Sequence, residues 1–209
     1  MTKTWRRLIG ASAIALMAAA DASAQDLGVG ARRAEWGGFP TGVFIFARHT
    51  PEDPPDFTNY AFGTSFAWNL NTYVGLEAEA GFGVGWTRAY NVRGVLVRQP
   101  MPDSAAYSGS VVISPIGNHR VIVPYVVGGM GALSLLPRDG TETVGVTSRE
   151  TMLTGNVGGG LKWYSPHEWG VRLDYRLLLI DHHDEALPLF GESGAQVGHR
   201  LYAGLFFGF

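Results

Sequence analysis

The sequence contains no cysteine, and only 16% of its 209 residues are charged. Without cysteine the chain is not a disulfide framework, so burial and hydrogen bonding must hold the fold. The 29 glycines and abundant aromatic residues also differ from the composition of a disordered chain. After residue 24, no apolar run is long enough for a membrane-spanning helix. If the chain crosses a membrane, it must do so with strands.

The N-terminal segment has the pattern of an export signal. Lys3, Arg6 and Arg7 precede an apolar run over residues 8–20, and the Ala-Ser-Ala sequence that ends at residue 24 offers a cleavage site. A membrane-anchoring helix is the alternative, but an apolar run of about 13 residues is shorter than the roughly 20 that a bilayer requires. We therefore predict a cleaved secretory signal peptide over residues 1–24 and one β-barrel domain over residues 25–209.

The charge of the predicted domain argues against nucleic acid as a partner. Residues 25–209 carry 13 basic and 17 acidic side chains. A nucleic-acid-binding domain needs a basic surface to neutralise phosphates. This domain is instead mildly acidic.

Alternation of apolar and polar residues recurs in segments of roughly ten residues, which is typical of outer-membrane strands. The predicted fold class is all-β, an eight-stranded antiparallel up-and-down transmembrane β-barrel. The eight predicted strands lie at 37–47, 60–69, 73–86, 106–115, 121–135, 152–163, 169–180 and 199–209.

The connections between these strands alternate in length. Tight turns with Asn, Gly or Pro are predicted at 70–72, 116–120 and 164–168. Because the other four connections are long, all of them emerge on one side of an up-and-down barrel, as in outer-membrane proteins. An even strand number then predicts that both termini are periplasmic. The long connections lie at 48–59, 87–105, 136–151 and 181–198.

The segment 169–180 assigns an inner and an outer face to the barrel wall. Arg172, Asp174 and Arg176 alternate there with apolar and aromatic residues. A cation on the lipid face near the midplane costs about 2–4 kcal/mol, so the charged residues must point inward. An eight-stranded barrel is just wide enough for side chains to fill it. The predicted ionic network of the lumen contains Glu77, Glu79, Lys162, Arg172, Asp174, Arg176 and Arg200.

Two carboxylates on one face, such as Glu77 and Glu79, are also what general acid and base chemistry uses. Residues i and i+2 of a strand share a face, however, and inward carboxylates opposite arginines neutralise charges that are costly to bury alone. We therefore interpret this pair as part of the lumen network.

Aromatic residues gather beside the predicted turns and near the opposite rim. Rings at both membrane interfaces form the aromatic girdles of transmembrane barrels. Stacking of bases or sugars is the alternative, but it does not account for both ends. The predicted girdle contains Trp68, Tyr73, Trp163, Tyr164 and Trp169 beside the turns, and Trp86, with Tyr60 and Tyr107, toward the other rim.

The last strand resembles the C-terminal assembly signal of bacterial outer-membrane barrels through Tyr202, Leu205, Phe207 and Phe209. This resemblance implies recognition by the barrel assembly machinery. Together with segments 124–131, 158–164 and 169–176, the ending resembles the small outer-membrane β-barrel domain family of the OmpA/OmpX type. The second half of the chain carries the resemblance by sequence and the first half by pattern. It implies contact with outer-membrane lipids and, for most members, structural or surface-interaction roles.

One segment suggests an enzyme. His182 and His183, with acidic neighbours and Ser193 nearby, contain the residue types of an esterase. The segment faintly resembles outer-membrane lipid A deacylases, in which a serine follows the catalytic histidine by two positions. Asp184 and Glu185 stand at those positions, so we interpret the segment as a solvated acidic loop. The histidines also lack metal-ligand spacing, and we expect no metal and no cofactor.

The sequence therefore predicts a monomeric, non-enzymatic outer-membrane barrel with a plugged lumen. We expect it to contribute to envelope integrity or to surface interaction, with any extracellular ligand bound by the long connections. A narrow pore is the main alternative, which requires a continuous water path past the lumen network. A lipid A hydrolase and a soluble lipocalin-like barrel are weaker alternatives.

Overall fold

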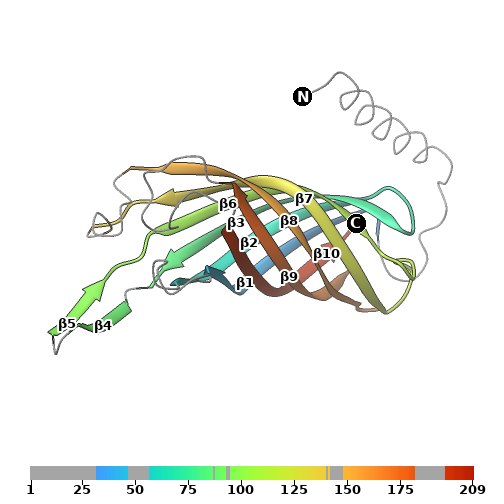
Figure 1. Ribbon diagram of the computed structural model, residues 1–209. Helices are drawn as coiled ribbons and strands as arrows, with labels where there is room; N and C mark the ends of the chain where they lie inside the picture. Colours follow the sequence, from blue (N-terminus) through green and yellow to red (C-terminus); the bar gives the residue numbers. More distant parts are fainter. Residues whose placement is uncertain are drawn as a thin grey trace, which may run out of the picture.

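The computed structural model describes residues 32–46, 57–86, 88–92, 95–139, 141, 148–181 and 196–209. The predicted signal peptide and much of the four long connections lie outside the described residues. The same holds for His182, His183 and Ser193. Figure 1 shows a closed barrel with a small hairpin projecting from the end opposite the C-terminus.

Eight strands close the barrel, each hydrogen-bonded to two antiparallel neighbours. All eight predicted strands are confirmed, with ends within three residues of the predicted ends. In their closed order they are β1 (Ala34–Phe46), β10 (Gln196–Gly208), β9 (Trp169–Asp181), β8 (Glu150–Tyr164), β7 (Ile122–Leu136), β6 (Asp103–Ile113), β3 (Val74–Gly85) and β2 (Phe57–Asn69).

The first and last strands meet at the end of the barrel that carries the tight turns. The backbone N–H of Ala34 donates to the carbonyl oxygen of Phe209 at 3.0 Å, and the Phe209 N–H donates to the Ala34 carbonyl at 2.9 Å. This closure leaves neither β1 nor β10 as an open edge, which is the condition for a sheet to exist in hydrocarbon.

The projecting hairpin consists of β4 (Arg88–Val92) and β5 (Val95–Gln99). In the sequence this region is part of the predicted long connection at 87–105. Each strand has only five residues, which is half the length of the alternating segments used to identify barrel strands. Within the described residues, β4 and β5 pair with each other as a separate two-stranded sheet.

A bulge interrupts β1 at Pro40. Pairing with β10 shifts from Gly38 opposite Leu205 to Thr41 opposite Ala203. Proline has no N–H to donate to the ladder, so a bulge is a tolerated place for it. The Tyr60 hydroxyl donates to the Pro40 carbonyl at 2.5 Å. Because one extra residue reverses the alternation, odd-numbered residues face the lumen before the bulge and even-numbered residues face it afterward.

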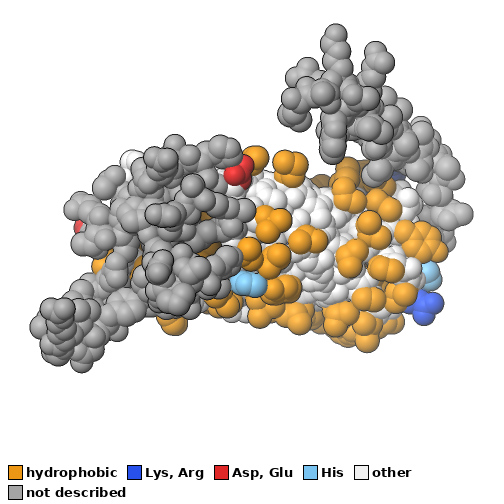
Figure 2. Space-filling model, in the orientation of Figure 1, with side chains coloured by type: hydrophobic (Ala, Val, Ile, Leu, Met, Phe, Trp, Pro, Cys, Tyr) orange, Lys and Arg blue, Asp and Glu red, His pale blue; other side chains and the backbone are white. Residues whose placement is uncertain are grey.

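The outer wall is apolar. Figure 2 shows hydrophobic side chains spread over the visible part of the wall. Large hydrophobic residues are exposed on all eight barrel strands, whereas soluble monomers rarely expose extended apolar surface. None of the described residues forms a helix that is long and apolar enough to cross a membrane.

Candidate functional site

The barrel lumen contains every buried charged side chain among the described residues. There are four carboxylates and four cations, so the formal charges balance. All seven residues predicted for the lumen network lie there, and Glu35 is an eighth that the sequence analysis missed. The eight are Glu35 on β1, Glu77 and Glu79 on β3, Lys162 on β8, Arg172, Asp174 and Arg176 on β9, and Arg200 on β10.

Asp174 is the centre of the larger ionic cluster. Its Oδ2 lies 2.6 Å from Nη2 of Arg172, and its Oδ1 lies 3.0 Å from Nε of Arg176. The same Oδ1 lies 3.3 Å from Nη2 of Arg200. The Tyr125 hydroxyl donates to Oδ2 at 2.5 Å. One carboxylate therefore contacts all three lumen arginines.

Glu77 and Glu79 approach the same arginines from the opposite wall, because β3 and β9 are four places apart in the closed strand order. Glu77 forms ion pairs with both Arg172 and Arg176. Glu79 Oε2 lies 3.2 Å from Nη2 of Arg176 and 2.9 Å from Nη2 of Arg200. These contacts are those of counter-ions, and they join strands that share no backbone hydrogen bonds.

A second cluster lies nearer the tight turns. Lys162 Nζ lies 2.5 Å from Oε2 of Glu35, and the Tyr164 hydroxyl donates to Oε1 at 2.7 Å. Asn69 Nδ2 also donates to Oε1, at 3.2 Å. Both oxygens of this buried carboxylate are therefore satisfied, which burial of an ion requires.

The prediction that Tyr164 belongs to the outer aromatic girdle is wrong. Lys162 and Tyr164 are two residues apart on β8, so they share the inner face, and Tyr164 is only 6% exposed. Trp163 between them points outward and is 40% exposed. The alternation of the strand places Tyr164 in the lumen as a hydrogen-bond donor to Glu35.

Aromatic rings cover several of the buried cations. The Arg172 guanidinium carbon lies 4.8 Å from the centre of the Tyr125 ring and 5.4 Å from that of Phe39. The Arg200 guanidinium carbon lies 4.5 Å from the centre of the Tyr202 ring. Such cation–π contacts contribute more when the cation is desolvated. Tyr202, predicted as part of the assembly signal, therefore has its side chain inside the barrel.

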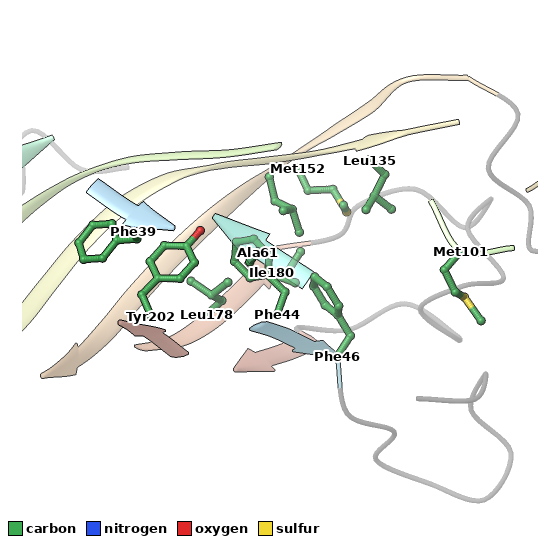
Figure 3. Close-up of a cluster of buried hydrophobic side chains, with 11 residues drawn as sticks. Phe39, Phe44, Phe46, Ala61, Met101, Leu135, Met152, Leu178, Ile180 and Tyr202 are labelled. Carbon is green, nitrogen blue, oxygen red and sulfur yellow. The ribbon is translucent and has the colours of Figure 1, made fainter. Parts of the chain in front are cut away.

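An apolar cluster occupies the other part of the lumen, toward the ends of the strands that lead into the long connections. Figure 3 shows it extending from Phe39 and Tyr202 to Met101. This cluster was not predicted from the sequence. Its members are Phe39, Phe44, Phe46, Ala61, Met101, Leu133, Leu135, Met152, Leu178, Ile180 and Tyr202.

The segment before β6 closes this end of the cluster. Met101 is 1% exposed. Asn59 Nδ2 donates to the Pro102 carbonyl at 3.1 Å and to Ser104 Oγ at 3.2 Å. A Cβ at Gly85 would lie 2.6 Å from the Pro102 carbonyl oxygen, so only glycine permits this close approach. The segment is therefore fixed against the mouth of the barrel.

The remaining girdle residues lie on the outer wall. Trp68, Tyr73 and Trp169 are exposed beside the tight turns, as Trp163 is. Tyr60 and Tyr107 are exposed on the parts of their strands nearer the long connections, and Trp86 is exposed directly after β3 at the same end. Three residues of the predicted assembly signal, Leu205, Phe207 and Phe209, also point outward.

The described part of the chain offers no group of three or more His, Cys, Asp or Glu side chains arranged to hold a metal ion. The histidine pair that suggested an esterase lies outside the described residues. The described contacts in the lumen include ion pairs, hydrogen bonds and apolar contacts.

Comparison with known proteins identifies the fold. The sequence matches no family model and no curated protein. Neisserial surface protein A has a TM-score of 0.56 at 13% identity, over 86% of this chain and 99% of that chain. The outer membrane protein OprG from Pseudomonas aeruginosa has a TM-score of 0.51 at 13% identity, over 88% of this chain and 98% of that chain. At this identity the likeness shows a shared fold, and it confirms the predicted resemblance to the small outer-membrane barrels.

Proposed function

We propose that this protein is a monomeric integral barrel of the outer membrane that contributes to envelope integrity or surface interaction and catalyses no reaction. One observation carries the proposal. The lumen is occupied by an electrically balanced ionic network and, beyond it, by an apolar cluster. A barrel filled in this way has little room for a solute to pass. We therefore expect its outer wall and its connections to carry the function.

The apolar outer wall supports a membrane location. Leu173 and Leu205 are exposed on the wall farther from the tight turns than tryptophans such as Trp68, which are exposed beside those turns. This is the arrangement expected of a wall that meets hydrocarbon between two interfaces. We propose that the barrel assembly machinery inserts the chain and that the turn end, with both ends of the barrel sequence, faces the periplasm.

The filled lumen favours a structural role over a pore. Ion pairs such as Arg172 with Glu77 join opposite walls across the middle of the lumen. Conduction would require water to pass these pairs and then the apolar cluster at the long-connection end. A hydrophobic constriction excludes water by dewetting, so it opposes ion passage even where the side chains leave a gap.

We expect any surface interaction to be made by the long connections. The β4–β5 hairpin projects beyond the barrel end (Figure 1), on the side that we propose to be extracellular. Loops carried by a rigid scaffold are common sites of recognition. The hairpin therefore presents backbone outside the membrane, where a ligand of the cell surface could meet it.

An envelope experiment distinguishes the three functions. Cells with and without the gene would be compared for entry of a hydrophobic dye, for uptake of a small hydrophilic solute, and for lipid A and phospholipid masses. We expect the dye to enter faster without the protein, with unchanged solute uptake and unchanged lipids. Slower solute uptake without the protein would indicate a pore instead. An acyl chain missing only when the protein is present would indicate a lipid hydrolase.

A further inference from the structure

A groove of about 350 Å³ lies on the outside of the barrel at the β1 bulge. Trp36 and Phe207 form one end of its lining, with ring centres 6.3 Å apart. Phe62, Leu205 and Pro40 complete the apolar sides. These residues belong to β1, β2 and β10, so the groove runs over the seam where the first and last strands meet.

Gly38 has no side chain to fill the groove. A Cβ at Gly38 would meet no atom within 4 Å. At the bulge, the Pro40 carbonyl oxygen accepts a hydrogen bond from the Tyr60 hydroxyl. The groove is therefore both open and apolar.

Two arginines stand at the turn end of the same strand. The Arg33 guanidinium carbon lies 5.2 Å from the centre of the Trp68 ring, on the outside of the barrel. Arg32 lies beside it in sequence and forms an exposed pair with Glu168 at 3.8 Å. Among the residues that the structure describes, no carboxylate is paired with Arg33. Its guanidinium is thus available to an anion at this rim.

We propose that this groove and Arg33 form a binding site for one phospholipid of the leaflet on the turn side. An acyl chain would occupy the groove, and Arg33, with Arg32 beside it, would bind the phosphate. The proposal rests on the proposed function, because it requires the outer wall to face lipid. Guanidinium groups bind phosphate through paired N–H donors, which a surface arginine at the interface can supply.

The spacing along β1 fits one lipid molecule. Arg33 is three residues from Trp36, a distance of about 10 Å along an extended strand, and Trp36 is four residues from Pro40, about 13 Å. The phosphate would therefore lie outside the tryptophans of the turn rim, and the chain would run inward from them. In the proposed orientation this leaflet is the periplasmic one, so the ligand is a phospholipid rather than lipid A.

Native mass spectrometry of the protein purified from membranes in mild detergent tests the site. Added phosphatidylglycerol of a single chain length would serve as the probe, and circular dichroism would verify that each variant folds. We expect wild type to retain one lipid. Gly38→Leu should lower the lipid-bound fraction about tenfold, since displacing a few methylene groups is sufficient for that change.

Matched variants separate the site from general effects. Gly109→Leu adds the same side chain at another outward glycine with open space around it, so its lipid retention should equal that of wild type. Arg33→Gln should lower retention, whereas Arg120→Gln, at an exposed turn of the same end, should not. Equal retention in Gly38→Leu and Gly109→Leu would overturn the site.

The identity of the retained lipid and the need for detergent provide two further outcomes. If lipid A copurified in the groove instead of phospholipid, the assignment to the turn-side leaflet would be wrong. A protein that stayed monodisperse without detergent would overturn the proposed function itself. A protein that needed detergent but held no lipid would overturn only the binding site.

Discussion

The two parts of the lumen hold the barrel together by different physical means. In the ionic cluster around Asp174, contacts are made by ionised groups that must be paired, and Glu77 on β3 pairs with Arg172 on the opposite wall. Around Leu133, contacts are apolar and need no specific partner atom. The ionic part therefore specifies which walls face each other, whereas the apolar part excludes water at the long-connection end.

The difference also predicts how each part tolerates change. Removing one member of a buried ion pair leaves an uncompensated charge, whereas replacing both members with apolar groups is often neutral. Shortening an apolar side chain leaves a cavity whose effect depends on how far its neighbours relax. Substitutions in the two parts should therefore differ in size and in the way that they combine.

The largest effect is expected from Asp174→Ala. This substitution leaves Arg172, Arg176 and Arg200 without a shared carboxylate, so the free energy of unfolding should fall by about 3–5 kcal/mol. Urea unfolding in lipid vesicles, followed by tryptophan fluorescence, would measure it. Glu77→Ala should also lower stability, and a fully stable Glu77→Ala variant would count against the network.

Leu133→Ala should give a somewhat smaller loss, of about 3 kcal/mol, because the deleted atoms leave a cavity in the apolar cluster. Leu153→Ala is the matched control. Leu153 points outward and is 57% exposed, so lipid can fill the space that the substitution leaves. Equal losses in the two variants would mean that the inner cluster is not closely packed.

Tyr164→Phe should lower the free energy of unfolding by about 1.5 kcal/mol, since it removes one hydrogen bond to the buried Glu35 carboxylate. Trp163→Phe, on the adjacent outer position, changes only a lipid contact and provides the comparison. If the outer substitution were the more destabilising of the two, Tyr164 would have no structural role in the lumen.

The smallest effect is expected from a double substitution. Lys162→Met alone leaves the Glu35 charge unpaired and should destabilise the barrel. Lys162→Met combined with Glu35→Gln removes both charges and keeps an oxygen that accepts from the Tyr164 hydroxyl, so it should lie within about 1 kcal/mol of wild type. Unfolding of both single variants and the double variant would give the coupling energy. Additive losses would mean a coupling energy of zero and would contradict mutual neutralisation of the two charges.

The strands and the ionic part of the lumen could be predicted from the sequence because charged residues indicate the inner face of these strands. In β9, Arg172, Asp174 and Arg176 alternate with apolar residues. In the apolar part of the lumen, the residues of the cluster are uncharged. Residues 177–180 are Leu-Leu-Leu-Ile, so the inner and outer faces of the strand are chemically the same. A lumen that is apolar at one end cannot be identified by alternation there.

Two other differences have local causes. The bulge at Pro40 reverses the alternation of β1, and the predicted strand began at residue 37, so Glu35 was not recognised as a partner of Lys162. The β4–β5 hairpin was missed because its strands are much shorter than a membrane crossing. Both features depend on strand pairing, which a single sequence does not specify.

Ion conductance is the most direct measurement of whether the two parts together fill the lumen. Purified wild-type protein would be inserted into planar lipid bilayers and compared with Asp174→Ala, with insertion verified by protease protection of the bilayer-embedded barrel. We expect no discrete channel openings from wild type, because ions would have to pass the paired charges and then the apolar cluster. Stable single-channel currents from the wild-type barrel would contradict a filled lumen.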